Sequence, residues 1–413
     1  MKPQAVAISD ALAALPDLLR RGPSPDALRS VTGSKAPPIL QRTLFSDRRP
    51  LQLVYRQGNQ TVIAEYHGSA AEAEADALRS SLAKSRRGLR AMLDAGAVVA
   101  DPETGLILRR PGLDARLPGL RLLHDTDAAR ALLTRIEGSD PGAVTTTLMA
   151  HRLGKRAVIR LTPATGPTRY LRLRAVKSRT GQTAFDRHRA LWAAARGSAA
   201  LILPEPLGEE AALGATLFAA LPGAPPGFDG PGAGQTCRAI AEAIASLQAL
   251  PLTGLPHHDG AAEARLLRDW FGRFQIVFPD DAADLALALQ QVTDALMTHQ
   301  PAPVPCHRDL HEKQILIDGP LAGLLDFDTV CLGAPAMDPG NLLAHLALAD
   351  ILKESSGHAE ATMAAALTGP EDSSLRLWRR AALLRLRMIY AFTDMAAAHL
   401  NALLQAASLP HDQ

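Results

Sequence analysis

Two stretches decide what this sequence predicts: Cys306-His-Arg-Asp-Leu-His-Glu-Lys-Gln-Ile-Leu-Ile-Asp318 and Leu324-Leu-Asp-Phe-Asp328. Short apolar runs over residues 314–317 and 321–325 lie on either side of Asp318-Gly319. A glycine turn between two apolar runs is typical of a β-hairpin. We therefore expect a hairpin here.

Three oxygen-bearing side chains lie on the loops that border this hairpin. Asp309 and Gln314 come at its start and Asp326 at its end, so a tight turn would bring two carboxylates and one amide oxygen together. Magnesium prefers oxygen ligands, and proteins usually hold it with one or two carboxylates plus substrate phosphates. The sequence therefore predicts a hard-cation site, with one carboxylate left to orient a hydroxyl group.

The order His307-Arg308-Asp309, Gln314 and Asp326 resembles the motif of the aminoglycoside phosphotransferase and choline kinase-like family, which shares its catalytic layout with protein kinases. That family shows a His-x-Asp segment, an Asn five residues after the Asp, and a hydrophobic strand that ends in a metal-binding Asp. The resemblance covers roughly residues 145–345. It implies an α+β, bilobal, protein kinase-like fold with a small β-rich N-lobe, a mostly helical C-lobe and an extra N-terminal α+β module.

The resemblance also implies a reaction, the ATP- and Mg²⁺-dependent transfer of a phosphoryl group to a hydroxyl of a sugar, amino sugar, aminoglycoside or amino alcohol. Asp309 would be catalytic, because it would accept or orient that hydroxyl. Gln314 and Asp326 would bind the metal, and Asp328 is either a further metal ligand or an exposed loop residue. Gln314 stands where the family has Asn; the maltokinase branch of kinase-like enzymes is similar in having Gln there.

For the nucleotide, the resemblance implies a strand cation and an acidic partner on the next helix. The family's strand lysine is missing, and Tyr170-Leu-Arg-Leu-Arg174 offers Arg172 and Arg174 in its place. Asp186 would be the acidic partner. Two alternatives stay open: the arginines are the solvated face of an edge strand, or Lys177 is the phosphate-binding cation.

The remaining nucleotide contacts would come from backbone. A hinge from Leu217 to Leu221 would receive the adenine, and the turn Gly154-Lys155-Arg156 would cover the phosphates. The acceptor pocket would be built by the variable helices, over residues 236–250 and 270–278. Acidic residues between those helices would attract an amine or, as the plainer interpretation, form solvated surface; they are Asp259, Glu263 and Asp269.

The first 140 residues contain no match to the family's catalytic residues. Residues 55–66 can be aligned with residues 151–161, so that Gly58 matches Gly154. This alignment favours a degenerate repeat of the N-lobe, with chance similarity of short hairpins as the alternative. We expect a cap module over residues 1–140, the N-lobe over 141–222 and the helical C-lobe over 223–413.

Apolar periodicity predicts the other elements. In the first 140 residues these are a helix over 11–19, a connector over 21–38, a hairpin over 51–66 and a helix over 70–93. Downstream they are a strand over 169–176 and helices over 183–195, 236–250, 261–278, 282–299 and after Pro339.

Composition narrows the partners. The 413 residues carry a net charge of only +2, which gives no global field to attract nucleic acid or an anionic membrane. Three cysteines without paired or metal-type spacing favour a reducing compartment. We therefore expect a cytoplasmic protein that binds ATP and a small hydroxyl substrate, without nucleic acid or membrane, and homodimer formation is left open.

Two other classes of function stay open. The missing strand lysine and Gln314 motivate a pseudokinase-like regulatory protein that binds nucleotide. A metal-dependent hydrolase could use the same carboxylates, but the spacing of Asp309, Gln314 and Asp326 favours a kinase.

Overall fold

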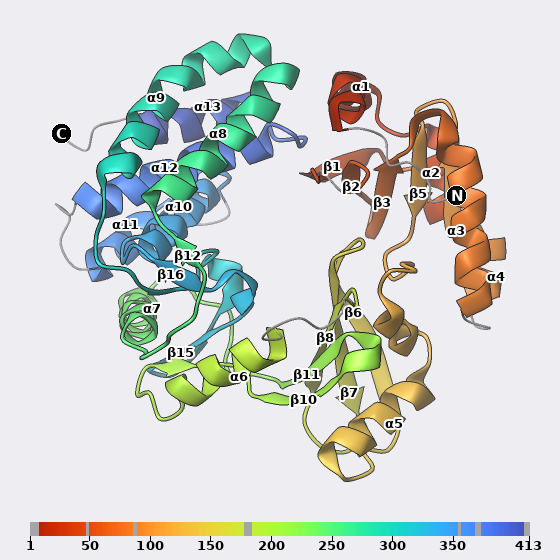
Figure 1. Cartoon of the computed structure of the whole chain (residues 1–413), viewed down its shortest axis with the longest axis horizontal. Coiled ribbons are helices and arrows are strands. Elements are labelled where there is room, and N and C mark those ends of the chain that lie inside the picture. Colours follow the sequence, from red (N-terminus) through yellow and green to blue (C-terminus); the bar gives the residue numbers. More distant parts are fainter. Residues whose placement is uncertain are drawn as a thin grey trace. The chain divides into compact units, whose positions relative to one another are not determined.

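The computed structural model describes residues 8–46, 49–85, 89–176, 184–353, 357–367 and 373–408 (Figure 1). These residues belong to two compact units. The first unit comprises Met1–Gly181, Pro206–Ala220 and Phe392–Asp394, and the second comprises Gln182–Glu205, Leu221–Ala391 and Met395–Gln413. The first is rich in strands and the second in helices, so the predicted α+β class is confirmed.

Two antiparallel five-stranded sheets form the first unit, and their strand orders are equivalent. The first sheet has the order β1-β2-β3-β5-β4 and the second has the order β6-β7-β8-β11-β10. In each, a β-bulge interrupts the first strand and a helix follows the third in sequence. The strands are β1 (Pro38–Leu44), β2 (Gln52–Gln57), β3 (Gln60–Tyr66), β4 (Val98–Asp101), β5 (Leu106–Arg109), β6 (Val144–Arg152), β7 (Arg156–Pro163), β8 (Arg169–Arg174), β10 (Pro206–Glu210) and β11 (Ala215–Ala219).

The alignment of Gly58 with Gly154 is wrong by one strand. Gly58 joins β2 to β3, the second and third strands of the first sheet, whereas Gly154 joins β6 to β7, the first and second strands of the other. Both glycines have a left-handed backbone, with φ of 59° and 65°. Because a tight turn and a period of two residues look alike in any hairpin, the local pattern cannot tell which hairpin it belongs to.

The helices of the first unit include two that the sequence does not predict, α2 (Pro25–Thr32) and α5 (Thr126–Glu137). Residues 21–38, predicted as a connector, contain α2: Ser24 caps it by accepting from the Ala27 amide at 3.4 Å, and Gly33 ends it with φ 71°. Leu28 and Val31 of α2 are fully buried, so this short helix is held by packing as well as by its caps. The helices are α1 (Ile8–Arg21), α2 (Pro25–Thr32), α3 (Ala71–Ser85), α4 (Arg90–Asp94) and α5 (Thr126–Glu137).

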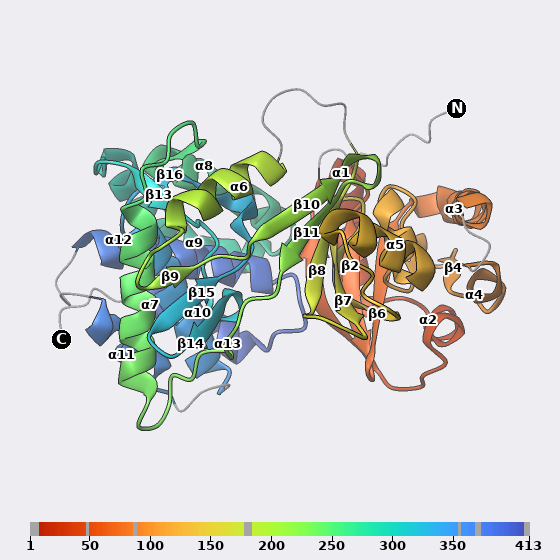
Figure 2. The same ribbon diagram turned by 90° about the horizontal axis from the view of Figure 1, so that it is seen from below.

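The core of the second sheet lies on the face that α5 covers (Figure 2). In β7, Ala157, Ile159 and Leu161 point into this core. In β8, Leu171 and Leu173 do the same. The residues that alternate with them lie on the opposite face, because successive side chains of a strand point to opposite sides.

A late segment of the chain returns to the first sheet. The Leu40 amide of the edge strand β1 donates to Asp394 at 2.5 Å, and Thr43 donates to the Phe392 carbonyl at 2.6 Å. Phe45 and Phe392 meet edge to face, with 5.0 Å between ring centroids. These contacts cover part of an edge that would otherwise expose unpaired backbone groups.

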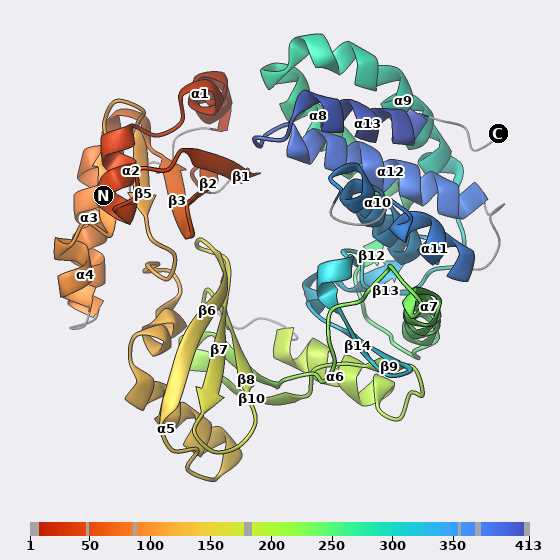
Figure 3. The same ribbon diagram turned by 180° about the vertical axis from the view of Figure 1, so that it is seen from behind.

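The second unit is a set of helices around two small sheets (Figure 3). The sheets have the orders β12-β16-β13 and β14-β15-β9. Their strands are β9 (Leu201–Ile202), β12 (His257–His258), β13 (Val304–Cys306), β14 (Ile315–Asp318), β15 (Leu321–Leu324) and β16 (Cys331–Gly333). The helices are α6 (Ala184–Ala195), α7 (Ala233–Gln248), α8 (Gly260–Val277), α9 (Pro279–Thr298), α10 (Met337–Ile351), α11 (Ala359–Ala366), α12 (Ser373–Tyr390) and α13 (Ala397–Ser408).

The predicted hairpin and helices of this unit are confirmed. β14 and β15 pair antiparallel from Ile315 opposite Leu324 to Asp318 opposite Leu321, around Gly319 at φ 60°. The hairpin packs into the core of the second unit through Ile315, Ala322 and Leu324. Within the described part of the chain, no helix has the length and apolar character needed to cross a membrane.

We expect Phe274→Ala to lower the free energy of unfolding of the second unit by about 3–5 kcal/mol. Phe274 is fully buried, and the Arg387 guanidinium lies 5.3 Å from its ring centroid. Urea denaturation followed by tryptophan fluorescence would measure this, because all three tryptophans (Trp192, Trp270 and Trp378) belong to the second unit. Ile276→Ala, at an exposed position of the same helix, is the control and should change stability by less than about 0.5 kcal/mol. Equal effects of the two variants would contradict the packing described.

Candidate active site

Leu325 joins the two stretches that carry the candidate residues. Its amide donates to the Gln314 carbonyl at 2.9 Å, and its carbonyl accepts from His307 Nε2 at 2.6 Å. Asp326 is the next residue, and Asp309 lies two residues after His307. The segments that carry Asp309, Gln314 and Asp326 are therefore tied together by hydrogen bonds, and the exposed carboxylate of Asp309 is accessible to solvent.

His307 is a structural residue in this geometry. It is fully buried, its ring lies 4.7 Å from that of Phe327, and Thr329 Oγ1 donates to its carbonyl at 3.0 Å. With Nε2 donating to Leu325, Nδ1 is the acceptor, and it receives the Asp309 amide at 3.4 Å. The imidazole thus links the hairpin to the backbone of Asp309.

Asp338 fixes the backbone of the same loop. One oxygen of its carboxylate accepts the His307 amide at 2.6 Å and the other accepts the Arg308 amide at 2.7 Å. The side chain is fully buried. Two amide donors stabilise a buried carboxylate that would otherwise be costly.

The loop has an unusual backbone. Among the described residues other than glycine, three have positive φ, and two of them are Arg308 at 72° and Asp326 at 63°. A left-handed backbone costs roughly 1–2 kcal/mol in a residue with a side chain, and such outliers cluster at functional sites. Here they occur next to Asp309 and at the predicted metal ligand itself.

Gln314 has the properties expected of a metal ligand. It is buried, and its Oε1 has no hydrogen-bond partner among the described residues. An unsatisfied buried oxygen costs about 1–3 kcal/mol, a cost that a hard cation or a water would remove. Asp326 and Asp328 are half-buried. No group of three His, Cys, Asp or Glu side chains in the described ranges could hold a metal alone, so substrate oxygens or water would complete a site made by these residues.

A buried network holds the other side of the loop. Asn341 Nδ2 donates to the Leu310 carbonyl at 2.8 Å, and Arg385 donates to both Asn341 and Glu263. His258 bonds the second oxygen of Glu263 at 2.7 Å. Burial raises the pKa of Glu263, but Arg385 and His258 outweigh it and lower the pKa to about 2.

The interpretation of Glu263 as solvated surface is therefore wrong. The residue is 2% exposed. Helical spacing could have found it, because Glu263 lies on the same face of α8 as the buried residues Gly260, Ala264 and Leu267. Its partners Asn341 and Arg385 are distant in sequence and gave no local signal.

The remaining side chains of the loop are packing or surface groups. His311 stacks on His345 with 5.0 Å between ring centroids, and burial lowers the pKa of His345 to about 3. Lys313 is exposed, 3.6 Å from Glu312. Cys306 and Cys331 are buried free thiols.

The predicted nucleotide residues are spread over both units. Arg172 and Arg174 are half-buried on β8, which is the central strand of its sheet, so the edge-strand alternative is wrong. They alternate with core leucines and share a sheet face with Arg156 and Arg160 of β7. This face therefore presents four arginines.

The other predicted nucleotide residues are placed individually. Asp186 lies on α6 in the second unit, 3.5 Å from Arg189, and its pairing with the strand arginines stays a prediction. Leu217 is buried in the core of the first unit, and Leu221 begins a segment of the second. Lys177 lies outside the described residues.

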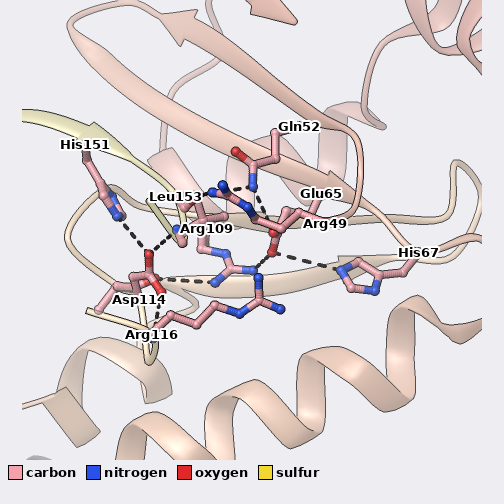
Figure 4. Close-up of polar contacts among 11 residues, drawn as sticks. Arg49, Gln52, Glu65, His67, Arg109, Asp114, Arg116, His151 and Leu153 are labelled. Atoms are coloured by element: carbon pink, nitrogen blue, oxygen red, sulfur yellow. Dashed lines mark hydrogen bonds and ion pairs between the residues drawn. The ribbon is translucent and has the colours of Figure 1, made fainter. Parts of the chain in front are cut away.

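The N-terminal module binds the β6–β7 turn, a contact that the sequence analysis missed (Figure 4). Asp114 accepts the Gly154 amide at 2.5 Å, and its contact with His151 Nε2 is 3.3 Å. Arg49 and Gln52 donate to the Leu153 carbonyl at 3.2 and 3.4 Å. Each backbone group of the turn named here has a partner more than thirty residues away in sequence.

A buried ion pair lies beneath this contact. Arg109 and Glu65 come from neighbouring strands of the first sheet and are both buried (Figure 4). Each follows three apolar residues, in Val62-Ile-Ala-Glu65 and in Leu106-Ile-Leu-Arg109. This pattern is the feature of the sequence from which the ion pair could have been predicted. A charge inside a strand that is otherwise buried usually has a partner.

Comparison with known proteins gives the family. The model of a phosphotransferase enzyme family matches residues 145–385, which is more than half of the chain. The chain belongs to this family, and the resemblance seen in its motif is confirmed.

Similar solved structures carry related names. Macrolide 2′-phosphotransferase MphH from Brachybacterium faecium has 18% identity, covers 70% of this chain and 100% of its own, and gives a TM-score of 0.44. A choline/ethanolamine kinase family protein from Mesorhizobium loti has 18% identity, coverage of 68% and 99%, and a TM-score of 0.47. A thermostable mutant of aminoglycoside phosphotransferase APH(4)-Ia has 15% identity, coverage of 68% and 100%, and a TM-score of 0.49. No curated protein sequence matches the chain.

We expect Asp338→Asn to lower the free energy of unfolding of the second unit by about 1–3 kcal/mol, because an amide accepts at one oxygen only and leaves one of two buried N–H groups facing a donor. Urea denaturation followed by tryptophan fluorescence measures it. Asp284→Asn, at an exposed position of α9, is the control and should be neutral. A neutral Asp338→Asn would show that the carboxylate does not fix the loop.

We expect Asp114→Ala to speed hydrogen exchange at the Gly154 amide by about tenfold or more, which corresponds to about 1.4 kcal/mol of lost protection. Hydrogen exchange read by NMR or mass spectrometry measures this. Asp127→Ala, at an exposed position of α5, should leave that amide unchanged. Unchanged exchange in Asp114→Ala would mean that other contacts hold the turn.

Proposed function

We propose that the chain transfers the γ-phosphoryl group of ATP to a hydroxyl group of a small molecule. The observation that carries this proposal is the pair of hydrogen bonds at Leu325, which ties the segments of Asp309, Gln314 and Asp326 together. Membership of a phosphotransferase family supports it. So do the names of similar structures, which include an ethanolamine kinase and an enzyme in complex with ADP and spectinomycin.

The chemistry assigned to Asp309 is proton acceptance. The acceptor's hydroxyl oxygen forms a bond to the γ-phosphorus, and the bond from that phosphorus to the β–γ bridging oxygen breaks. ADP leaves with the electron pair, and the hydroxyl proton passes to the Asp309 carboxylate and then to solvent. The hydrogen bonds of His307 and Asp338 hold the backbone of the loop, so the base is positioned before substrate binds.

Gln314, Asp326 and Asp328 would hold Mg²⁺, and the unpartnered Oε1 of Gln314 supports this assignment. Bound Mg²⁺ would neutralise charge on the nucleotide phosphates. Arg172 and Arg174 would bind phosphate in place of a strand lysine, and Asp186 would orient them. Backbone between Leu217 and Leu221 would receive the adenine.

Each part of the chain has a place in this proposal. Residues 141–222 would form the N-lobe and residues 223–413 the C-lobe. Residues 1–140 would act as a module that holds the turn at Gly154, which would cover the phosphates. The hydrogen bonds from Asp114, Arg49 and Gln52 to that turn support this role.

We expect Asp309→Asn to lower turnover by about 10²–10⁴-fold, the usual contribution of a general base, while leaving nucleotide binding within about twofold of wild type. ADP release with ATP, Mg²⁺ and a panel of sugars, amino alcohols and antibiotics measures turnover, and calorimetry with ADP measures binding. Asp318→Asn, at an exposed position of the hairpin turn, is the control. Full turnover by Asp309→Asn would refute the assignment, and nucleotide binding without turnover by the wild type would favour a regulatory protein.

A further inference from the structure

A hollow of about 470 Å³ lies in the second unit between α8 and the loop that carries Asp309. Arg265, Arg268 and Asp269 of α8 line it, together with His258 and Arg308. Its volume falls within the range of small-molecule sites, roughly 300–1,000 Å³. Arg308 is adjacent in sequence to Asp309, so a molecule in this hollow would lie beside the loop that carries the proposed base.

The charge of the hollow is uncompensated. Among the described residues, the guanidinium groups of Arg265, Arg268 and Arg308 make no ion pair and no side-chain hydrogen bond. Asp269 is the one carboxylate in the lining. Three positive charges therefore face one negative charge, and His258 adds none while neutral.

Glu263, a buried acid that interacts with Arg308, is already engaged by other partners. The two oxygens of Glu263 are engaged by Arg385 and by His258, the latter at 2.7 Å. The carboxylate is therefore neutralised by its own partners. Arg308 adds to the electrostatic stabilisation of this carboxylate without an ion pair to it, whereas Arg265 and Arg268 have only Asp269 and solvent.

Arg308 is held in place by its backbone. Its φ of 72° is maintained because its amide donates to Asp338 at 2.7 Å. A guanidinium group offers a planar fork of donors that matches the oxygens of a carboxylate or a phosphate. Arg308 therefore presents such a group from a fixed backbone, and Arg265 and Arg268 add two more from α8. This arrangement suits an anionic group better than a cationic or neutral one.

We propose that this hollow binds the acceptor and that the acceptor is anionic, a hydroxyl compound that carries a carboxylate or a phosphate group bound by Arg265, Arg268 and Arg308. This inference rests on the proposed function. The anionic group is unchanged in the reaction: a separate hydroxyl oxygen of the acceptor bonds to the γ-phosphorus of ATP, the proton goes to Asp309, and ADP leaves. Aminoglycosides and amino alcohols, which carry amines, would be repelled.

A matched set of acceptors on one skeleton tests the charge preference: gluconate, glucose 6-phosphate, glucose and glucosamine, each with ATP and Mg²⁺. We expect kcat/KM for gluconate or glucose 6-phosphate to exceed that for glucose by about tenfold or more, with glucosamine the poorest. The first two compounds distinguish a carboxylate from a phosphate. A preference for glucose or glucosamine would overturn the proposal and leave the phosphotransferase assignment intact.

Binding provides a readout that does not need turnover. Inorganic phosphate is titrated by calorimetry into wild type and into Arg265→Gln/Arg268→Gln, with saturating ADP and Mg²⁺ to fill the nucleotide site. We expect the double variant to bind phosphate about tenfold more weakly, while the control Arg238→Gln, at an exposed position of α7, binds like wild type. Equal binding by all three proteins would refute the anion site.

Phosphate binding and acceptor phosphorylation together distinguish failure of the anion site from failure of the proposed function. If phosphate binding depends on the arginines but no acceptor is phosphorylated by wild type, the anion site stands and the proposed function fails. For an active anionic acceptor, Arg268→Gln should raise KM by about tenfold with kcat unchanged, because the arginine contributes binding that is equal in the ground state and the transition state. A fall in kcat alone would contradict a binding role.

Discussion

Asp338 accepts two successive backbone amides, those of His307 and Arg308, and the geometry of the candidate site depends on this pair of bonds. They hold Arg308 in a left-handed conformation, which sets the direction in which the loop continues to Asp309. His307 then bonds to Leu325 and so connects the loop to the hairpin. A single carboxylate at the start of α10 thus supports the positions of both the base candidate and the metal-ligand candidates.

The parts of the fold that could be predicted are those determined by near neighbours in sequence. The hairpin β14–β15 follows from two apolar runs and Gly319, and α7, α8 and α9 follow from apolar spacing. The convergence of Gln314 and Asp326 follows from the hairpin register alone, because Ile315 lies opposite Leu324. Short-range sequence patterns were therefore sufficient to predict that the segments of Gln314 and Asp326 lie together.

The parts that could not be predicted depend on contacts between distant residues. The sequence allowed Glu263 to be interpreted as surface, because its contacts with Arg385 and His258 are known only from the structure. Asp114 and Gly154 are forty residues apart, and the sequence around neither residue predicts the hydrogen bond between them. One alternative placed the strand arginines on an edge strand, because pattern gives the alternation of a strand but not its place in a sheet. Sheet topology is set by tertiary packing. It determines both the central position of β8 in its sheet and which hairpin contains Gly58.

The charges of the second unit fall into two groups with different consequences. The buried carboxylate of Glu263 pairs with the half-buried guanidinium of Arg385, and this ion pair supports the loop that carries Asp309. The guanidinium groups of Arg265, Arg268 and Arg308 make no ion pair among the described residues. A net charge of only +2 is therefore compatible with a local positive field at this hollow.

The contact of β1 with Phe392 and Asp394 has a consequence for how the protein is made. Leu40 and Asp394 are separated by 354 positions. At synthesis rates of about 5–20 residues per second, the ribosome adds the partner of Leu40 roughly 20–70 s after Leu40 itself. During that interval the edge of the first sheet lacks its cover, while most of the second unit is still being translated. A nascent chain would therefore expose this strand to other nascent chains and to chaperones until Asp394 has been synthesised.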